Sequence, residues 1–154
     1  MKKTRLSLIA FLIVLPFVFS NCKKDSSTSI TAKMSASIDG ASWSAATTSA
    51  TDGTAFSISG VSASGTVITI SIYDNLKVGT FTLSKYSFGV ATYLENDFGY
   101  TTNATSEAGG DLIITDVNST VHTLTGTFSF DVVGLTNGEK KSITNGVFSN
   151  VSYK

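Results

Sequence analysis

The sequence contains few of the residues on which many catalytic and nucleic-acid-binding sites depend. It has one cysteine, one proline, one histidine and one arginine, which are Cys22, Pro16, His122 and Arg5. No arginine follows residue 21, and arginine is the side chain best suited to bind phosphate groups and base edges. Residues 22–154 hold eight lysines and eleven acidic residues, a formal net charge of −3. We therefore expect no nucleic-acid partner.

The N-terminal segment has the organisation of a secretory signal. Three basic residues among the first five precede an apolar stretch, residues 6–19. This stretch is shorter than the run of about 20 apolar residues that spans a bilayer. It ends shortly before Cys22, so we predict that residues 1–21 are a signal peptide that is removed.

The junction Ser20-Asn21-Cys22 resembles the lipobox of bacterial lipoproteins, although Phe19 and Asn21 differ from its commonest residues. In that family the cysteine becomes the acylated first residue of the mature protein. The resemblance implies a membrane anchor of several acyl chains, such as palmitate, on Cys22, because stable attachment needs more than one chain. The alternative is an ordinary free or buried thiol.

This interpretation divides the chain into three parts and predicts a location. Residues 22–29 are the lipidated cysteine and a polar, flexible tether. Residues 30–154 form one β domain. We expect a lipoprotein of the outer membrane in the cell envelope, facing either the periplasm or the cell surface.

The β domain is predicted from apolar residues that recur at every second position. Residues 30–38 and 121–133 alternate in this way, and residues 56–59 and 66–73 should form a hairpin around residues 62–65. Further strands are expected at residues 79–83, 88–94, 98–102 and 111–115, and Ile143, Val147, Val151 and Tyr153 should line a final strand. Gly109-Gly110 and Asn137-Gly138 are expected turns.

The fold class follows from this punctuation of short strands by turns. After the signal no segment keeps a period of 3.6, and β-branched and aromatic residues dominate the alternating segments. We predict an all-β fold, a single antiparallel β-sandwich or β-barrel-like domain. With one cysteine, no disulfide can form within the chain, so stability must come from the apolar core.

Three stretches together resemble a family of small Bacteroidota lipoproteins recorded as a domain of unknown function. They are Ile38-Asp-Gly-Ala-Ser-Trp-Ser-Ala, Gly126-Thr-Phe-Ser-Phe and Ile143-Thr-Asn-Gly-Val-Phe-Ser-Asn-Val. The resemblance implies an envelope location and a β fold. It supplies no catalytic residues.

His122 is the one histidine available for acid–base chemistry or metal binding. It is expected on the apolar-facing side of its strand, near the strand's start, where a structural or rim role is the main interpretation. A metal site needs several ligands, and no second histidine exists; we expect no metal and no cofactor. The nearest string to a serine-hydrolase motif, residues 60–65, is one residue too long and lies in a predicted hairpin.

Carboxylate pairs remain as candidate catalytic groups. Glu95 and Asp97 would lie about 6.6 Å apart in an extended strand, within the range used by glycoside hydrolases. The surrounding Glu-Asn-Asp-Phe-Gly segment more closely fits a solvated turn. A pocket that holds two of Glu95, Asp97, Glu107 and Asp111 would support a carboxylate-based hydrolase.

Aromatic residues cluster in the middle of the chain. We single out Tyr86, Tyr93, Phe98 and Tyr100 as candidate ligand-binding residues, with Phe88 nearby and Trp43 as the one tryptophan. Such rings can stack on sugars or line an apolar pocket, and the alternative is that they pack in the core. A ligand site predicts that Tyr86, Tyr93 or Tyr100 is exposed on one concave face, and burial of all three would contradict it.

Two functions from different classes follow. The first is a non-enzymatic, membrane-anchored lipoprotein that binds a glycan or a small apolar ligand. The second is a structural or protein-interaction module of the envelope, with an envelope protein as partner. A carboxylate-based hydrolase is the third alternative.

Overall fold

The computed structural model describes residues 33–154. All regular secondary structure in this range is β-strand, which confirms the all-β class. The strands are β1 (Lys33–Ile38), β2 (Ala41–Thr51), β3 (Phe56–Ser62), β4 (Val67–Ile72), β5 (Gly79–Leu83), β6 (Gly89–Glu95), β7 (Phe98–Thr101), β8 (Gly109–Asn118), β9 (Thr123–Gly134) and β10 (Lys140–Ser152). The predicted signal peptide, Cys22 and tether lie outside the described residues. Within these residues we find no helix with the length and hydrophobicity of a membrane span.

The ten strands form one sheet that closes on itself. The neighbours run in the order β10-β1-β2-β3-β4-β6-β5-β8-β9-β7, and the further pairings of β10 with β9 and of β6 with β7 close the sheet. All pairings between named strands are antiparallel except β5 with β6, which share the single pair Leu83 and Gly89. Between a sandwich and a barrel-like domain, the structure is therefore the closed, barrel-like alternative.

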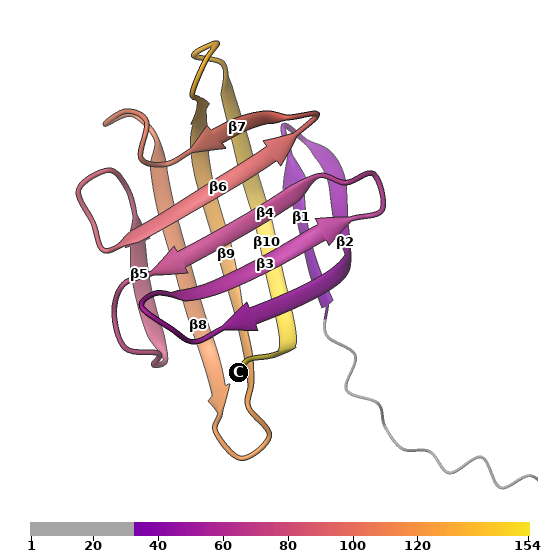
Figure 1. Ribbon diagram of the computed structural model, residues 1–154, viewed down its shortest axis with the longest axis vertical. Helices are drawn as coiled ribbons and strands as arrows, with labels where there is room; N and C mark the ends of the chain where they lie inside the picture. Colours follow the sequence, from indigo (N-terminus) through magenta and orange to yellow (C-terminus); the bar gives the residue numbers. More distant parts are fainter. Residues whose placement is uncertain (1–32) are drawn as a thin grey trace, which may run out of the picture.

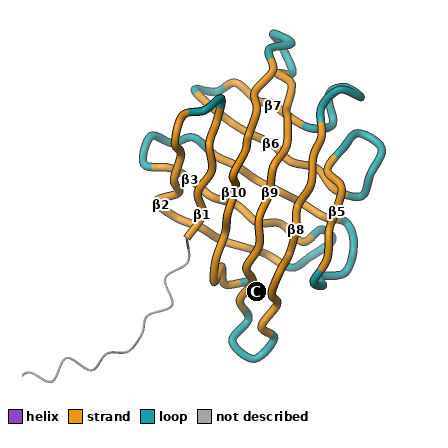
Figure 2. Tube along the Cα trace, turned by 180° about the vertical axis from the view of Figure 1, so that it is seen from behind, coloured by secondary structure: helices purple, strands orange, loops and turns teal. Residues whose placement is uncertain are grey.

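The closed sheet is flattened into two layers whose strands cross. Strands β2, β3, β4, β6 and β7 form the front layer in Figure 1, and β5, β8, β9, β10 and β1 run behind them. Figure 2, from the opposite side, shows the second layer as neighbouring strands with loops at their ends. The side chains between the layers are the core.

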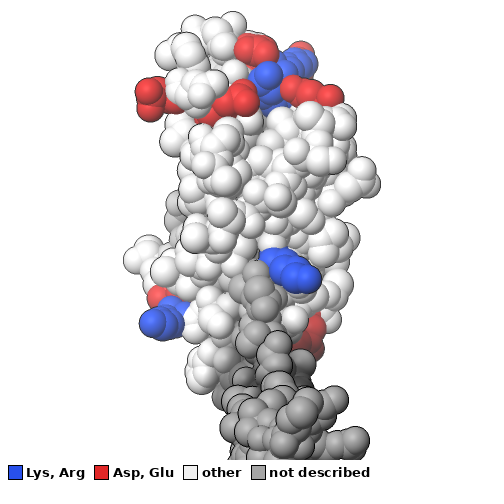
Figure 3. Space-filling model, turned by 90° about the vertical axis from the view of Figure 1, so that its right-hand side faces the viewer, with Lys and Arg blue, Asp and Glu red and all other residues white. Residues whose placement is uncertain are grey.

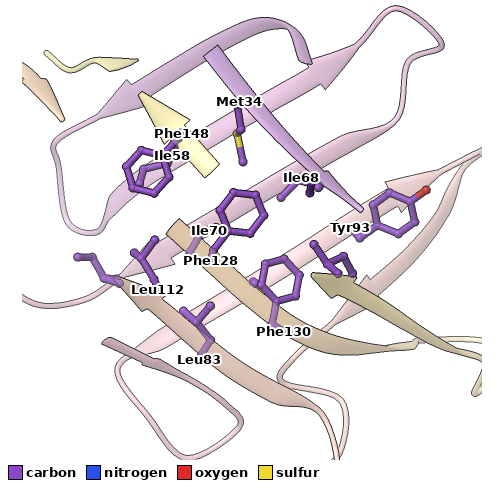
Figure 4. Close-up of a cluster of buried hydrophobic side chains, with 14 of the residues drawn as sticks. Met34, Ile58, Ile68, Ile70, Leu83, Tyr93, Leu112, Phe128, Phe130 and Phe148 are labelled. Carbon is purple, nitrogen blue, oxygen red and sulfur yellow. The ribbon is translucent and has the colours of Figure 1, made fainter. Parts of the chain in front are cut away.

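Aromatic and branched side chains fill this core (Figure 4). Phe128 stacks against Phe130 and Phe148, with ring centroids 5.8 and 6.4 Å apart. Ile58, Ile68 and Ile70 reach them from the opposite layer and are fully buried. The alternation predicted for residues 121–133 is confirmed from Thr123 onward, because Leu124, Phe128, Phe130 and Val132 all point inward.

Glycines allow these rings to lie directly against neighbouring strands. A Cβ atom at Gly146 would collide with the ring of Phe128, and one at Gly126 would collide with Phe148 and with the carbonyl of Ile113. Both glycines belong to the stretches that carry the family resemblance. Packing of the aromatic core thus explains why these two stretches contain glycine at positions 126 and 146.

One strand of the structure is missing from the sequence predictions, and one predicted turn is wrong. Strand β2 was not expected, because Ala41–Thr51 is rich in Ala, Ser and Thr and buries only Trp43 and Ala50. Gly109-Gly110 begins strand β8 instead of making a turn, and Gly110 is needed there because any Cβ would meet the backbone of Ser129.

The final strand also departs from simple alternation. The pairing of β10 with β9 shifts register between Ile143 and Gly146 and again between Phe148 and Val151. Asn145 and Asn150, in these intervals, have positive φ angles of 52° and 51°. Such bulges turn Phe148 inward and leave Val147, expected inside, on the surface.

Candidate functional site

A pocket opens at one end of the closed sheet, where the turns β1–β2, β3–β4, β6–β7 and β9–β10 meet. We call it the end pocket, and its volume is about 240 Å³. It is lined by Ile38, Asp39, Ala41, Ser42, Trp43, Ser64, Thr66, Tyr93, Glu95 and Lys141. These residues come from the four strands β1, β2, β6 and β10 and from the β1–β2 and β3–β4 connections, so only the closure of the sheet brings them together.

Polar side chains reach the end pocket because they lie on the inner face of the sheet, at the ends of strands whose other inner side chains are buried. Lys141 pairs with the buried Val132 and so lies on the inner face of β10. Across the β6–β7 hairpin, Tyr93 pairs with Tyr100, and Glu95 with Phe98. The buried rings therefore lie below Glu95 and Phe98 on one face.

Lys141 is the centre of an ion-pair network. Its Nζ atom lies 3.0 Å from Oε1 of Glu139 and 3.4 Å from Oδ2 of Asp39, and its side chain is 19% exposed. The Tyr100 ring lies below it, 6.0 Å from Nζ, and the Tyr100 hydroxyl donates to Glu139 over 3.2 Å. The hydrogen bond to Glu139 raises the pKa of Lys141, and the same contact lowers the pKa of Glu139.

Asp39 is held by the backbone of β10. Its Oδ1 atom accepts the Ser142 N–H over 2.8 Å, and its own N–H donates to the Ser142 carbonyl over 2.9 Å. Asp39 has a φ of 49° and precedes Gly40, whose φ is 85°, which makes the two-residue connection of a tight hairpin. The turn thus fixes the carboxylate beside Lys141.

Tyr93 connects the core to the pocket. In Figure 4 its ring lies among the buried side chains and its hydroxyl points away from them. Burial raises the pKa of this hydroxyl above its usual range, and the neighbouring Glu95 carboxylate raises it further. The hydroxyl is therefore a donor beside the Glu95 carboxylate.

Trp43 forms another wall of the end pocket. Its indole N–H donates to Oγ1 of Thr66 over 2.8 Å. The ring fits because β3 carries Gly60 beneath it, where an added Cβ would lie 2.9 Å from Cη2 of Trp43. This bond fixes the orientation of the only indole in the protein.

Charge is unevenly distributed along the molecule. On the face drawn in Figure 3, most charged side chains gather at the upper end, and the surface below is largely uncharged. The upper end in this view is the one that bears the β9–β10 hairpin in Figure 1. The end pocket thus lies within the charged part of the surface.

Both ends of the described chain lie away from the end pocket. Strand β1 runs from Lys33 to Ile38, and only its last residue lines the pocket. Strand β10 begins near the pocket at Lys141 and runs to the opposite end, where the Lys154 carbonyl accepts the Asp52 N–H. The pocket therefore faces away from the point at which the preceding residues join the domain.

The four aromatic candidates are divided by the structure. Tyr93 and Tyr100 are 2% and 4% exposed, so the expectation that they lie open on a concave face is wrong. Phe98 is 53% exposed on the rim, on the same face as these two rings. Tyr86 is 81% exposed in the β5–β6 connection, away from the other three.

His122 does not face the core. It lies in the β8–β9 turn with a φ of 52°, one residue before β9 begins, and is exposed. Its ring lies 5.4 Å from that of Tyr153. The expected inward orientation is wrong, because the alternation of β9 does not extend into the turn. The exposed position next to the start of β9 does agree with the rim position that was the main interpretation.

The four candidate carboxylates lie at different places. Glu95 lines the end pocket, and Asp97 lies at the exposed tip of the β6–β7 turn, which confirms that segment as a turn. Glu107 pairs with Lys140, and Asp111 borders a groove on the outer face of β8, β9 and β10. In residues 33–154 no group of three or more His, Cys, Asp or Glu side chains could hold a metal ion.

Two other hollows have neither an indole nor a cationic side chain in their lining. One of about 310 Å³ at the opposite end is lined by Asp52, Phe56, Tyr73 and Asp74 among others. The groove on the outer face, about 480 Å³, is bordered by side chains such as Ile113 and Val147. We therefore treat the end pocket as the candidate site.

Sequence reasoning missed Asp39, Thr66, Glu139 and Lys141 as site residues. The Asp39-Gly40 pair is a recognisable hairpin turn, and this was the one available signal. Nothing local marks Lys141, since a lysine beside Lys140 near a strand end resembles ordinary surface. Its importance depends on which side of β10 faces inward.

Comparison with known proteins places the chain in a family without assigning an activity. No curated protein and no solved structure matches the chain. A family model does match, and it covers residues 30–152, most of the chain. The chain therefore belongs to the family described as a domain of unknown function, DUF6252.

Proposed function

We propose that this protein is a membrane-anchored envelope lipoprotein whose β domain binds a glycan, without enzymatic action, in the end pocket. The observation that carries this proposal is the pocket itself, in which Trp43 and Tyr93 meet Asp39, Glu95 and Lys141. Ligand sites typically combine ring walls with a few convergent polar groups. The volume of about 240 Å³ is slightly below the usual range of about 300–1,000 Å³ and suits a ligand of about one sugar ring.

The rim supports a sugar in particular. Phe98 is half exposed and lies beside Glu95 across the β6–β7 hairpin. A sugar ring that stacks on Phe98 would bring its hydroxyl groups to the carboxylate. Two of the aromatic residues singled out from the sequence, Tyr93 and Phe98, therefore belong to the proposed site.

The proposed anchor is consistent with this site. An acyl group on Cys22 would hold the domain through the segment that precedes Lys33, at the end opposite the pocket. The pocket would then open away from the membrane. Whether that is towards the periplasm or the cell exterior is tested by protease shaving of intact cells, with a periplasmic protein as the leakage control.

A glycan array with the full-length protein in detergent tests the binding. We expect Phe98→Ala to weaken a positive signal about tenfold or more, because it removes the stacking surface. Phe88→Ala is the matched control, since Phe88 is 78% exposed in the connection before β6 and far from the pocket residues. Equal losses in the two variants, or no bound glycan, would contradict the proposal.

The anchor has its own test. Cys22→Ser should move the protein from the membrane fraction to the soluble fraction, while Ser20→Ala should leave it in the membrane. Retention of the serine variant in washed membranes would exclude acylation at Cys22 as the attachment.

A second function, a protein-interaction module, is favoured by the surface around β5. Tyr73, Val78, Tyr86 and Phe88 are all more than half exposed there, and clustered apolar exposure marks protein contacts. Strand β5 is also joined to β6 at one pair only, so part of its edge has no strand partner. A photo-crosslinker at Tyr86 in intact cells should capture a specific protein, and one at Val147 is the control.

A further inference from the structure

We propose that the ligand of the end pocket carries a protonated amine, as an amino sugar does, and that the pocket discriminates against anionic sugars. This inference rests on the proposed function and defines its ligand more narrowly. It follows from which donors and acceptors in the pocket are already engaged.

The one cation of the pocket is already shared by two acids. Nζ of Lys141 contacts both Glu139 and Asp39, and the ring of Tyr100 lies beneath it. An ammonium group has three donors, so a sugar carboxylate that took the third would lie close to both Glu139 and Asp39. These like charges would repel one another strongly, because the site is partly buried.

The acceptors of the pocket exceed its donors. Asp39 accepts the Ser142 N–H and pairs with Lys141, and Glu95 lines the pocket as a second carboxylate. An ionised carboxylate has about four lone-pair positions, so both acids can accept more. A ligand ammonium supplies three donors and no acceptor, which matches this surplus.

The net charge around the pocket points the same way. The charged groups that line it are Asp39 from the β1–β2 turn, Glu95 from β6 and Lys141 from β10, and Glu139 from the β9–β10 turn contacts Lys141 beside the pocket. Their formal sum is −2. Apolar walls such as Trp43 concentrate the field of these charges, and aromatic faces also attract cations.

The test uses the single tryptophan and the single histidine as reporters. Trp43 lines the pocket, and His122 lies at the other end of β9. The isotope-labelled full-length protein in detergent is titrated with glucosamine, glucose and glucuronate in mildly acidic buffer, where the amine is protonated and carboxylates are ionised. The indole N–H signal of Trp43 and the ring signal of His122 are followed by NMR.

We expect glucosamine to shift the Trp43 signal saturably, with a Kd about tenfold or more below that of glucose, because hydrogen bonds to charged groups are the stronger ones. Glucuronate should bind more weakly than glucose, and His122 should not respond. Glu95→Gln should bring the Kd values of glucosamine and glucose close together. Asp97→Asn, which removes a carboxylate from the tip of the same hairpin, should leave their ratio unchanged.

The two proposals fail in different ways. If glucose or glucuronate binds at Trp43 as tightly as glucosamine, the amine inference is wrong and the glycan site remains. If none of the three sugars shifts the Trp43 signal of the folded protein, the proposed glycan site is wrong, and the inference with it. If Asp97→Asn lowers the ratio as much as Glu95→Gln does, the preference arises from general surface charge and the assignment to the pocket is overturned.

Discussion

The two ends of the closed sheet hold their charges differently. At the pocket end, Lys141 is largely buried and shared by two carboxylates and a ring. At the other end of β4, the pair Lys77–Asp74 stands alone in solvent, with side chains 60% and 44% exposed. The same kind of ion pair is thus part of a site at one end and a solvated surface feature at the other.

This difference shows that burial and shared partners give an ion pair structural importance. Exposed pairs contribute little, because water screens the attraction and two long side chains lose freedom. A partly buried lysine between two acids is different, because its removal leaves like charges close together. The predictions below test this contrast, beginning with the core that connects the two ends.

The largest effect should come from the core common to both ends. Phe128→Ala removes a ring that stacks on Phe130 and Phe148, and should reduce the free energy of unfolding by about 3–5 kcal/mol. Thermal unfolding followed by Trp43 fluorescence and by the His122 NMR signal should show one common, lower transition. Separate transitions would mean that the ends unfold independently.

A smaller and local effect is expected from Gly60→Ala. The new Cβ would lie 2.7 Å from Sδ of Met34 and 2.9 Å from Cη2 of Trp43, so the indole must move. We expect a loss of about 1–3 kcal/mol from overpacking, with a shifted Trp43 emission spectrum. Gly53→Ala, in an open loop, is the control, and an unchanged Trp43 spectrum in Gly60→Ala would contradict the packing described here.

The ion pairs themselves can be compared directly. Lys141→Met should lower Tm measurably, because Asp39 and Glu139 then face each other without a cation. Lys77→Met should leave Tm unchanged within error, since that pair is exposed. Equal Tm values for the two variants would remove the distinction between the ends.

The smallest expected effect concerns how Tm depends on pH. Lys141 lowers the pKa of Glu139, so ionised Glu139 stabilises the folded protein fully above the ordinary carboxyl pKa of about 4.3. This stabilisation is lost as pH falls through the lower pKa that Glu139 has in the folded state. The pKa of Lys141 is raised by Glu139, so its contribution is present below about 10.4 and is lost as pH rises through the raised value. Tyr93, whose pKa is raised by burial, adds to the alkaline loss above about 10.

We therefore expect Tm to be nearly constant between these limits and to fall beyond both. Lys141→Met should lower the plateau and flatten both limbs, and Lys77→Met should leave the alkaline limb as it is. Tm measured across the pH range by circular dichroism checks this. An unchanged profile in Lys141→Met would show that the network does not contribute to stability.

Local pattern predicted those strands whose side chains alternate without interruption. Strand β9 and the β3–β4 hairpin lie where the sequence placed them, because each inward position is apolar and each turn has turn chemistry. Strand β10 was only partly predictable. Its bulges at Asn145 and Asn150 change which side of the strand faces inward. They could not be predicted, because the presence of an asparagine does not by itself indicate a positive φ angle.

The site was less predictable than the fold. Tyr93 and Phe98 were singled out as aromatic candidates, and they do lie on one face of the β6–β7 hairpin. Their exposure could not be predicted, because it depends on how far each residue lies from the end of the closed sheet. Asp39 and Lys141 are separated by about a hundred residues and become neighbours only through the pairing of β1 with β10.

The sequence by itself determined the all-β class, most strand positions and the poverty in arginine, histidine and cysteine, because these depend on composition and on the period of two. Only the tertiary structure decided that the sheet closes, that Lys141 faces inward, and that Asp39, Trp43 and Glu95 surround one pocket. The physical reason is that strand pairing between distant segments sets register and closure. A one-residue shift in the register of a strand would move its side chains to the opposite face of the sheet.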